Sequence, residues 1–241
     1  MTETDPDTPD DVLVVRIPMA APGTAASRGP DPRVVRTRTA IATVATTLFL
    51  QQGYQGTSID EIAAAARVSK RSVYNNFGDK QRLFTEIVLG ATPTAAEFTE
   101  QLVTGLAHAD DVPAALRTVA RRQLAAVAQP RVLQLRRLII LEAARFPDLA
   151  AEYYRRAPGR VIDALTTAFA ALHARGELHV PDPRRAAEHY SYLVLGAVLD
   201  AALFAPGTPL QTAAELDEIA DSGTAAFLTA YRPKRPREGE S

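Results

Sequence analysis

Residues 57–80 constrain the fold of this chain more than any other segment, because they contain two helix starts separated by one tight turn. Thr57 and Ser58 each precede an acidic residue by three positions, which is the spacing of a capping box at a helix N-terminus. Ser69 is expected to cap a second, polar helix, and Val68 is expected to pack inward from the turn. The segment therefore predicts two short helices joined by a tight turn.

The apolar residues on both sides of this segment recur at helical spacing and predict an all-α protein. Ile41, Ala45 and Phe49 lie on one helical stripe, and Gly53 is expected to end that helix as a left-handed cap. Further helices are expected near residues 94–107, 111–128, 131–145, 148–156, 158–175, 183–204 and 212–231. No alternating strand pattern of useful length follows residue 20.

Composition divides the chain into four parts. Residues 1–34 are rich in Pro, Gly, Asp, Ser and Thr and are expected to be a disordered arm, although residues 12–17 have the composition of a short strand. Residues 35–90 form the predicted helix-turn-helix domain, and a proline break near its end separates it from a second helical domain over residues 91–231. Residues 232–241 are a basic, Pro-broken tail that is expected to be mobile.

The composition also excludes several kinds of site. The chain has no cysteine, which excludes disulfides, thiolate metal sites and thiol nucleophiles. Its four histidines are scattered and no Gly-rich phosphate loop is present, so no metal, cofactor or enzymatic activity is expected. The sequence lacks an apolar run of transmembrane length and a signal-like start, which predicts a cytoplasmic protein with no membrane partner.

Positive charge is concentrated in one part of a nearly neutral chain. The formal net charge is −1, yet residues 33–88 carry eight basic and four acidic side chains. Such a local positive region fits a small, specific contact with phosphates rather than general binding to polyanions.

The second short helix of the opening segment is expected to have two different faces. If Val73 and Phe77 are buried, the opposite face carries Lys70, Arg71, Tyr74 and Asn75. Lys and Arg suit the acceptors of guanine and Asn suits adenine, so this face predicts contacts with base edges in a DNA major groove. Donors suited to phosphates are carried by Thr57, Ser72, Asn76 and Lys80. The alternative is an ordinary three-helix bundle whose polar face is simply solvated.

Residues 36–88 resemble the DNA-binding domain of the TetR/AcrR family of transcriptional repressors. The resemblance rests on a combined pattern of Leu48-Phe49, Gly53-Tyr54, Thr57-Ser58-Ile59, Glu61-Ile62-Ala63, Val68-Ser69-Lys70, Val73-Tyr74, Phe77, and Lys80 with Leu83-Phe84. It implies an all-α homodimer that binds double-stranded DNA at a palindromic operator. It also implies a second domain that a small-molecule effector controls.

The residue types and the resemblance together give a set of candidate DNA contacts. They are Arg36, Thr57, Ser69, Lys70, Arg71, Ser72, Tyr74, Asn75, Asn76 and Lys80. Arg28, Arg33 and Arg38 are further candidates for the backbone or the flanking minor groove, with a solvated arm as the alternative. Arg67 departs from the family, which usually has Gly in this turn, and a positive φ there costs on the order of 1 kcal/mol. Its side chain either contacts a phosphate or is merely exposed.

The second domain resembles a narrower group. Residues 131–146 are expected to form a helix in the middle of the domain, because its run Leu138–Leu141 is apolar on all sides. With residues 174–178 they resemble the C-terminal domain of the AefR-like branch of TetR regulators, which implies a domain that holds a small ligand and dimerises. Candidate ligand-binding residues are Phe98, Leu102, Leu138, Glu142, Phe146, Phe169 and His173. The alternatives are a plain apolar core, a pair between Glu142 and Arg145, and a structural role for His173.

The last two predicted helices favour a homodimer through residues near 183–231. Residues 190–204 and 213–231 each carry a broad apolar face with small residues, which suits a four-helix contact with two helices from each subunit. A palindrome also requires two recognition helices about 34–36 Å apart. The alternative is that these helices cover only their own domain.

The sequence therefore predicts a ligand-responsive transcriptional regulator, and more specifically a repressor that a small molecule releases from its operator. Ligand binding is expected to shift the helix near residues 80–90 and change the spacing of the recognition helices. A coupling of about 1–3 kcal/mol weakens DNA binding about 5- to 150-fold. The alternative is a DNA-binding co-regulator or architectural protein without an effector.

Overall fold

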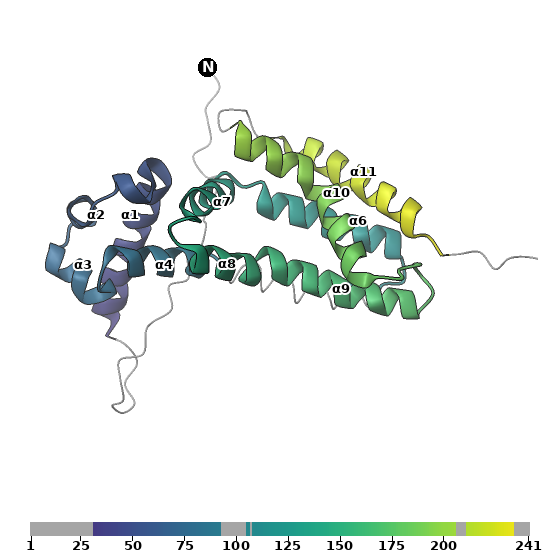
Figure 1. The fold of residues 1–241 in the computed structure, drawn as a ribbon, viewed down its shortest axis with the longest axis horizontal. Coiled ribbons are helices and arrows are strands. Elements are labelled where there is room, and N and C mark those ends of the chain that lie inside the picture. The colour runs from purple at the N-terminus through teal and green to yellow at the C-terminus, as the bar shows by residue number, and fades with distance from the viewer. Residues whose placement is uncertain (1–30, 93–104, 107, 206–210, 234–241) are drawn as a thin grey trace, which may run out of the picture. The chain divides into compact units, whose positions relative to one another are not determined.

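The computed structural model describes residues 31–92, 105–106, 108–205 and 211–233. Every regular element in these ranges is a helix, which confirms the predicted all-α class (Figure 1). Contacts between residues divide the chain into two compact units: the first contains the described residues up to 92 together with 134–153, and the second contains the rest. None of the described helices is both long and apolar enough to cross a lipid bilayer.

The first unit is built around the segment that carries the two predicted short helices. Its helices are α1 (Pro32–Gly56), α2 (Ile59–Ala65), α3 (Lys70–Phe77) and α4 (Lys80–Gly90), together with α7 (Pro130–Glu142) from residue 134 onward and α8 (Pro147–Arg156) up to residue 153. The core between them uses the apolar stripes expected from the sequence. Its fully buried members include Ile41, Phe49, Ile62, Val73, Leu83, Phe84 and Ile87.

Helix α1 starts earlier than the predicted domain boundary. The side chain of Asp31 caps it by accepting a hydrogen bond from the Arg33 amide at 2.9 Å, and Pro32 suits the first turn because its missing amide hydrogen needs no partner there. Residues 32–34 are therefore helical and do not belong to the predicted arm. The rest of that arm, residues 1–30, lies outside the described residues.

Four aromatic rings from distant parts of the sequence pack together in the first unit. Gly53 has φ 74° and kinks α1 instead of ending it, and Tyr54 follows directly. The ring centroid of Phe84 lies 5.2 Å from Phe49 and 5.0 Å from Tyr54. Phe146, between α7 and α8, adds a ring 4.8 Å from Tyr54 and 5.6 Å from Phe84. This packing explains why residues 134–153 group with the first unit, whereas the sequence-based division placed them in the second domain.

The described residues of the second unit contain four long helices, which lie close to their predicted positions. They are α6 (Val112–Val127), α9 (Pro158–Ala174), α10 (Pro183–Phe204) and α11 (Ala213–Tyr231). Of the helix expected near residues 94–107, only residues 105–106 are described, and these are helical. Of the basic tail, residues 234–241 lie outside the described part.

The core of the second unit is centred on stacked aromatic side chains. The ring of Phe227 on α11 lies 5.0 Å from that of Phe169 on α9 and 5.1 Å from that of Tyr190 on α10. The Tyr190 hydroxyl donates a hydrogen bond to the Leu116 carbonyl of α6 at 2.6 Å. Tyr190 therefore connects four helices: its ring packs against α9 and α11, and its hydroxyl bonds to α6. The ring is removed from water while its polar end keeps a hydrogen-bond partner.

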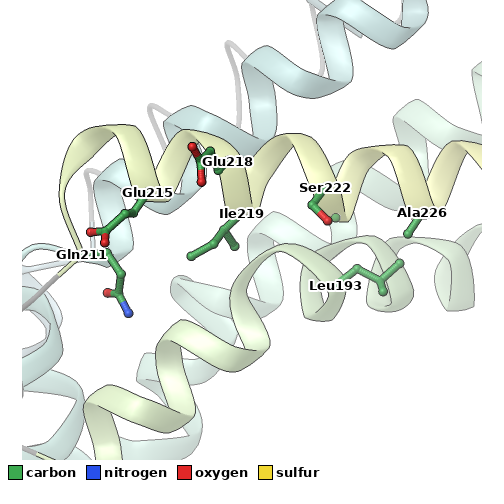
Figure 2. Close-up of a pocket in the computed structure, with 8 residues that line it drawn as sticks. Leu193, Gln211, Glu215, Glu218, Ile219, Ser222 and Ala226 are labelled. Carbon is green, nitrogen blue, oxygen red and sulfur yellow. The ribbon is translucent and has the colours of Figure 1, made fainter.

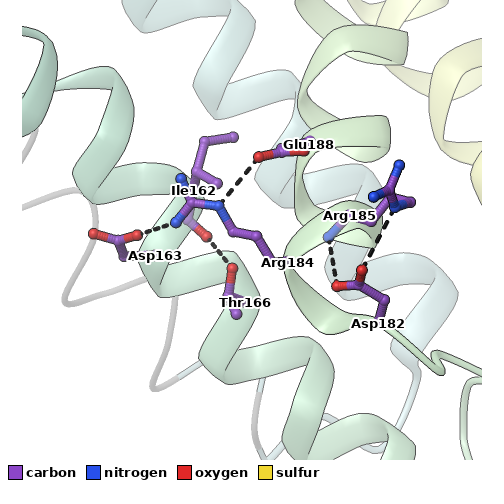
Figure 3. Close-up of polar contacts among 7 residues, drawn as sticks. All are labelled: Ile162, Asp163, Thr166, Asp182, Arg184, Arg185 and Glu188. Atoms are coloured by element: carbon purple, nitrogen blue, oxygen red, sulfur yellow. Dashed lines mark hydrogen bonds and ion pairs between the residues drawn. The ribbon is translucent and has the colours of Figure 1, made fainter.

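Polar contacts reinforce the packing of α9 against α10 (Figure 3). Arg184 on α10 bonds to the Asp163 carboxylate on α9, and its Nε donates to Glu188, one turn along α10, at 3.2 Å. Asp182 caps α10 by accepting a hydrogen bond from the Arg185 amide at 3.0 Å. Since these pairs are exposed to water, the apolar core contributes most of the stability.

Candidate nucleic-acid interface

The start of α2 uses the second of the two predicted caps. The Ser58 hydroxyl accepts a hydrogen bond from the Glu61 amide at 3.1 Å, and the Glu61 carboxylate accepts one from the Ser58 amide at 2.8 Å. Thr57 is only 1% exposed, and its hydroxyl donates to the Gly53 carbonyl at 2.9 Å. The prediction that Thr57 contacts a phosphate is therefore wrong, because its buried hydroxyl donates to a carbonyl of α1 inside the protein.

The turn between α2 and α3 keeps its shape with Arg67 at its centre. Arg67 adopts φ 54°, the left-handed conformation that usually favours Gly. The Val68 amide donates to the Ala63 carbonyl at 3.0 Å, which closes the turn. The hydroxyl of Ser69 then accepts a hydrogen bond from the Ser72 amide at 3.1 Å and caps α3, as predicted.

Helix α3 has the two faces that its sequence predicts. Val73 and Phe77 are buried in the core of the first unit. The other face exposes Lys70, Arg71, Tyr74 and Asn75. Tyr74 is 44% exposed, so both its ring and its hydroxyl are accessible on this face.

Lys70, at the start of α3, is paired with a carboxylate that the sequence analysis did not consider. Its ammonium lies 2.9 Å from an oxygen of Asp60 on α2. The hydrogen bond and the charge of Asp60 raise the pKa of Lys70. Both side chains are exposed, so the pair is accessible to water and to any approaching phosphate.

The polar residues on the inner edge of α3 are less accessible. Ser72 and Asn76 are half-buried, and the Asn76 amide group donates to the Ser72 carbonyl at 2.8 Å. Asn76 is thus bonded to its own helix and can reach a phosphate only with its remaining donor hydrogen.

Two arginines of α1 have different roles. Arg38 is buried, bonds to the Asn76 carbonyl and the Glu86 carboxylate, and lies over the Phe77 ring with its guanidinium carbon 4.3 Å from the centroid. It therefore joins α1, α3 and α4 inside the unit, and the hypothesis that it contacts DNA is wrong for this conformation. Arg36 is exposed and stays a candidate contact.

Lys80 begins α4, directly after the recognition helix. Asp79 caps α4 by accepting a hydrogen bond from the Arg82 amide at 2.7 Å. The ammonium of Lys80 lies 4.3 Å from the centroid of the Tyr54 ring. Burial lowers the pKa of Lys80, and the charge of Arg145 lowers it further. Lys80 therefore lies at the N-terminus of α4, next to the Asp79 carboxylate that caps this helix.

Neither spacing nor a motif predicts that Asp60 lies beside Lys70, or that Tyr54 and Arg145 lie near Lys80. Lys70 and Asp60 are ten residues apart on different helices, so helical spacing does not pair them. Arg145 is 65 residues beyond Lys80, and no motif links the two positions. Only the folded structure brings these charges together.

Comparison with known proteins agrees with this geometry. Residues 41–87 match the family model of bacterial regulatory proteins of the tetR family, and residues 114–233 match the C-terminal domain of AefR-like transcriptional repressors. A solved TetR-family transcriptional regulator from Mesorhizobium loti MAFF303099 is 35% identical, with a TM-score of 0.75 over 84% of this chain and 100% of that one. The chain belongs to the TetR family of transcriptional regulators.

Other TetR-family proteins are similar over different lengths. The HTH-type transcriptional regulator AcrR of Shigella flexneri is 51% identical over 51 residues, which is 21% of this chain and 24% of that protein. The chain thus spans about a quarter of the length of that relative. The solved flavonoid-responsive regulator FrrA is 29% identical, with a TM-score of 0.62 over 83% of this chain and 100% of that one.

The residues expected to line an effector pocket in this TetR-family chain are distributed over both units. Phe98 and Leu102 lie outside the described residues. Leu138 is buried, Glu142 pairs with Arg145 at 3.6 Å as the alternative interpretation predicted, and Phe146 belongs to the aromatic cluster. In the second unit Phe169 is part of the core, and the His173 Nδ1 lies 3.2 Å from the Leu178 carbonyl oxygen and 3.3 Å from the Val180 amide nitrogen.

An open groove lies between α10 and α11 (Figure 2). It has a volume of about 570 Å³ and is lined by Leu193, Gln211, Glu215, Glu218, Ile219, Ser222, Gly223 and Ala226. Tyr192 and Phe204 on α10 are also exposed, at 70% and 86%.

Proposed function

We propose that this TetR-family regulator is a cytoplasmic homodimeric repressor, which binds a palindromic operator through α3 and leaves it when a small molecule binds the second domain. The observation that carries the DNA-binding part is the exposed face of α3. It holds two cations, one amide and one tyrosine on a helix whose other face is buried in a stable core. Such a helix suits a major groove.

The proposed contacts divide into base readers and phosphate contacts. Base edges are assigned to Lys70, Arg71, Tyr74 and Asn75, which are all exposed. Phosphates are assigned to Arg36, Ser69, Ser72, Asn76 and Lys80. Ser69 already accepts a hydrogen bond as the cap of α3, and its hydroxyl hydrogen remains available as a donor.

The exposed face of α10 and the groove beside α11 support the homodimer. Tyr192, Leu193 and Phe204 are too accessible for side chains that only cover their own unit. Burying about 100 Å² of apolar surface from each contributes roughly 2.5 kcal/mol per side chain before the entropy cost of association. A two-fold axis through this face pairs each α10 and α11 with its copy in a four-helix contact.

The similarity to FrrA supports a small-molecule effector, since that protein is named for its response to flavonoids. The competing proposal, a DNA-binding co-regulator without an effector, is supported by the close packing of Phe169, Tyr190 and Phe227. A panel of flavonoids and other planar aromatics added to the protein–DNA complex distinguishes the two. Release of DNA at micromolar ligand supports the repressor, and no release by any compound favours the co-regulator.

DNA binding is tested by selecting duplexes from a random library with the full chain and measuring their affinity. An enriched palindrome with nanomolar Kd is the expected result. Tyr74→Ala and Lys70→Ala should each weaken binding to this duplex about tenfold or more and leave unfolding unchanged. Tyr154→Ala is the matched control, because Tyr154 is 54% exposed in the second unit. The proposal is contradicted if the full chain enriches no sequence from the library.

The dimer is tested by sedimentation of a Tyr192→Glu, Phe204→Glu double variant. A charge on each exposed ring position should convert the dimer to a folded monomer, which loses operator affinity. Tyr154→Glu is expected to remain dimeric. A double variant that sediments like the unmodified chain places the interface elsewhere.

A further inference from the structure

We propose that Arg145, on the turn between α7 and α8, is a positioning residue for the DNA contact of Lys80 and acts through the ring of Tyr54. The inference rests on the proposed function, because it assigns a second cation to the phosphate site at the start of α4. It extends that site beyond the helix-turn-helix, since Arg145 lies within the residues that match the C-terminal domain of AefR-like repressors.

The two cations share one aromatic ring. The Lys80 ammonium lies 4.3 Å from the centroid of Tyr54, and the guanidinium carbon of Arg145 lies 5.8 Å from the same point. A cation within about 6 Å of an aromatic ring is attracted to the electron-rich face. Tyr54 therefore holds both side chains in the first unit, although they come from segments 65 residues apart in the sequence.

The position of Arg145 is itself fixed by two polar partners. Its Nε lies 3.6 Å from the Glu142 carboxylate, one turn earlier in the chain. The side-chain oxygen of Gln55, in the amide orientation that satisfies its hydrogen bonds, accepts from both terminal nitrogens of the guanidinium. The neighbouring residue, Phe146, is held by Tyr54 and Phe84. The guanidinium of Arg145 is thus held by Gln55 of α1 and by Glu142 at the end of α7.

The positive charge of Arg145 affects how Lys80 binds an anion such as a DNA phosphate. Arg145 repels the Lys80 ammonium and lowers its pKa, while the weaker effects of Glu142 and Glu61 raise it. A phosphate oxygen beside Lys80 relieves this repulsion. Arg145 therefore favours the conformation in which Lys80 points to the DNA backbone, and it strengthens the contact without touching DNA.

Four variants of the full-length chain test this inference on the duplex selected from the random library. Arg145→Gln removes the charge, Arg145→Lys retains it, Lys80→Met removes the proposed contact, and the fourth combines Arg145→Gln with Lys80→Met. Arg145→Gln is expected to weaken binding about three- to tenfold at low salt and to lower its salt dependence. Arg145→Lys should restore most of the affinity. The loss caused by Arg145→Gln should vanish in the Lys80→Met background.

A structural role for Arg145 gives a different result. If Arg145→Gln weakens binding equally with and without Lys80, or leaves it unchanged, the inference is wrong. If Arg145→Gln does not fold, Tyr54→Phe and Tyr54→Leu provide the second test, since only the first keeps an aromatic ring beside the two cations. Equal affinity of these two variants contradicts the inference. If the unmodified chain selects no duplex, the proposed function fails and the inference fails with it.

Discussion

The Lys70 ammonium on the recognition helix lies 2.9 Å from the Asp60 carboxylate on the preceding helix. The first residue that is proposed to contact a base is therefore partly neutralised before DNA arrives. Asp60 is exposed and also presents a negative charge on the surface that approaches phosphates.

Asp60→Asn should increase affinity for DNA, because it frees Lys70 and removes a charge that repels the backbone. The expected gain is about two- to fivefold at low salt and smaller at high salt, with the larger relative gain on non-specific DNA. Kd measured from 50 to 300 mM salt provides the check. Asp110→Asn, an exposed change in the second unit, is the control. An Asp60→Asn variant that binds no more tightly would show that the Asp60 charge does not weaken the DNA contact of Lys70.

Arg38→Met should destabilise the first unit by about 2–4 kcal/mol. It leaves the Glu86 carboxylate and the Asn76 carbonyl without their donor in a largely buried position. Urea unfolding measures the loss. Arg36→Ala is the matched control two residues away, because Arg36 is exposed. The control should unfold like the unmodified chain and lose DNA affinity only, with a reduced salt slope. Equal stability of the two variants would refute the structural role of Arg38.

Arg67→Gly should stabilise the protein by roughly 0.5–1 kcal/mol, because Gly adopts φ 54° without the clash that a Cβ atom introduces. Arg67→Ala keeps the Cβ and should not stabilise. The two changes also test whether the Arg67 side chain contacts a phosphate. If the Arg67 side chain contacts a phosphate, both variants should lose the same amount of DNA affinity. If the side chain is merely exposed, both variants should bind DNA like the unmodified chain.

Gly223→Ala should cost about 1–3 kcal/mol of stability. A Cβ atom at Gly223 would lie 2.8 Å from the Leu193 carbonyl oxygen, which belongs to the backbone of α10 and cannot turn away. Gly196→Ala is the control, since its Cβ would meet no atom within 4 Å and Ala favours the helix by about 1 kcal/mol. Thermal unfolding of both variants provides the comparison. A tolerated Gly223→Ala would mean that α10 and α11 separate easily.

Most of the fold was predictable because helix signals are local. Caps such as Ser58, Ser69 and Asp182 act within three residues of their own position, so the sequence contains the whole interaction. The inward placement of Val73 and Phe77 follows from helical periodicity for the same reason. The exposed face of α3 could therefore be derived before the structure was known.

The errors concern residues whose partners are distant in sequence. Arg38 was a candidate DNA contact because its chemistry suits a phosphate, but its partners Asn76 and Glu86 lie 38 and 48 residues away. Thr57 was misjudged because the kink at Gly53 turns its hydroxyl inward. Neither the side-chain type nor the spacing reveals such tertiary contacts.

The place of Phe146 in the aromatic cluster has a consequence for how such regulators diversify. A single recombination event after residue 92 would combine the DNA-binding helices with a foreign sensor, but Tyr54 and Phe84 would lose the ring that covers them. A functional chimaera must inherit residues 134–153 from the same parent as the head, which requires two further crossovers. Phe146 and the helices that carry Tyr54 and Phe84 should therefore be inherited together.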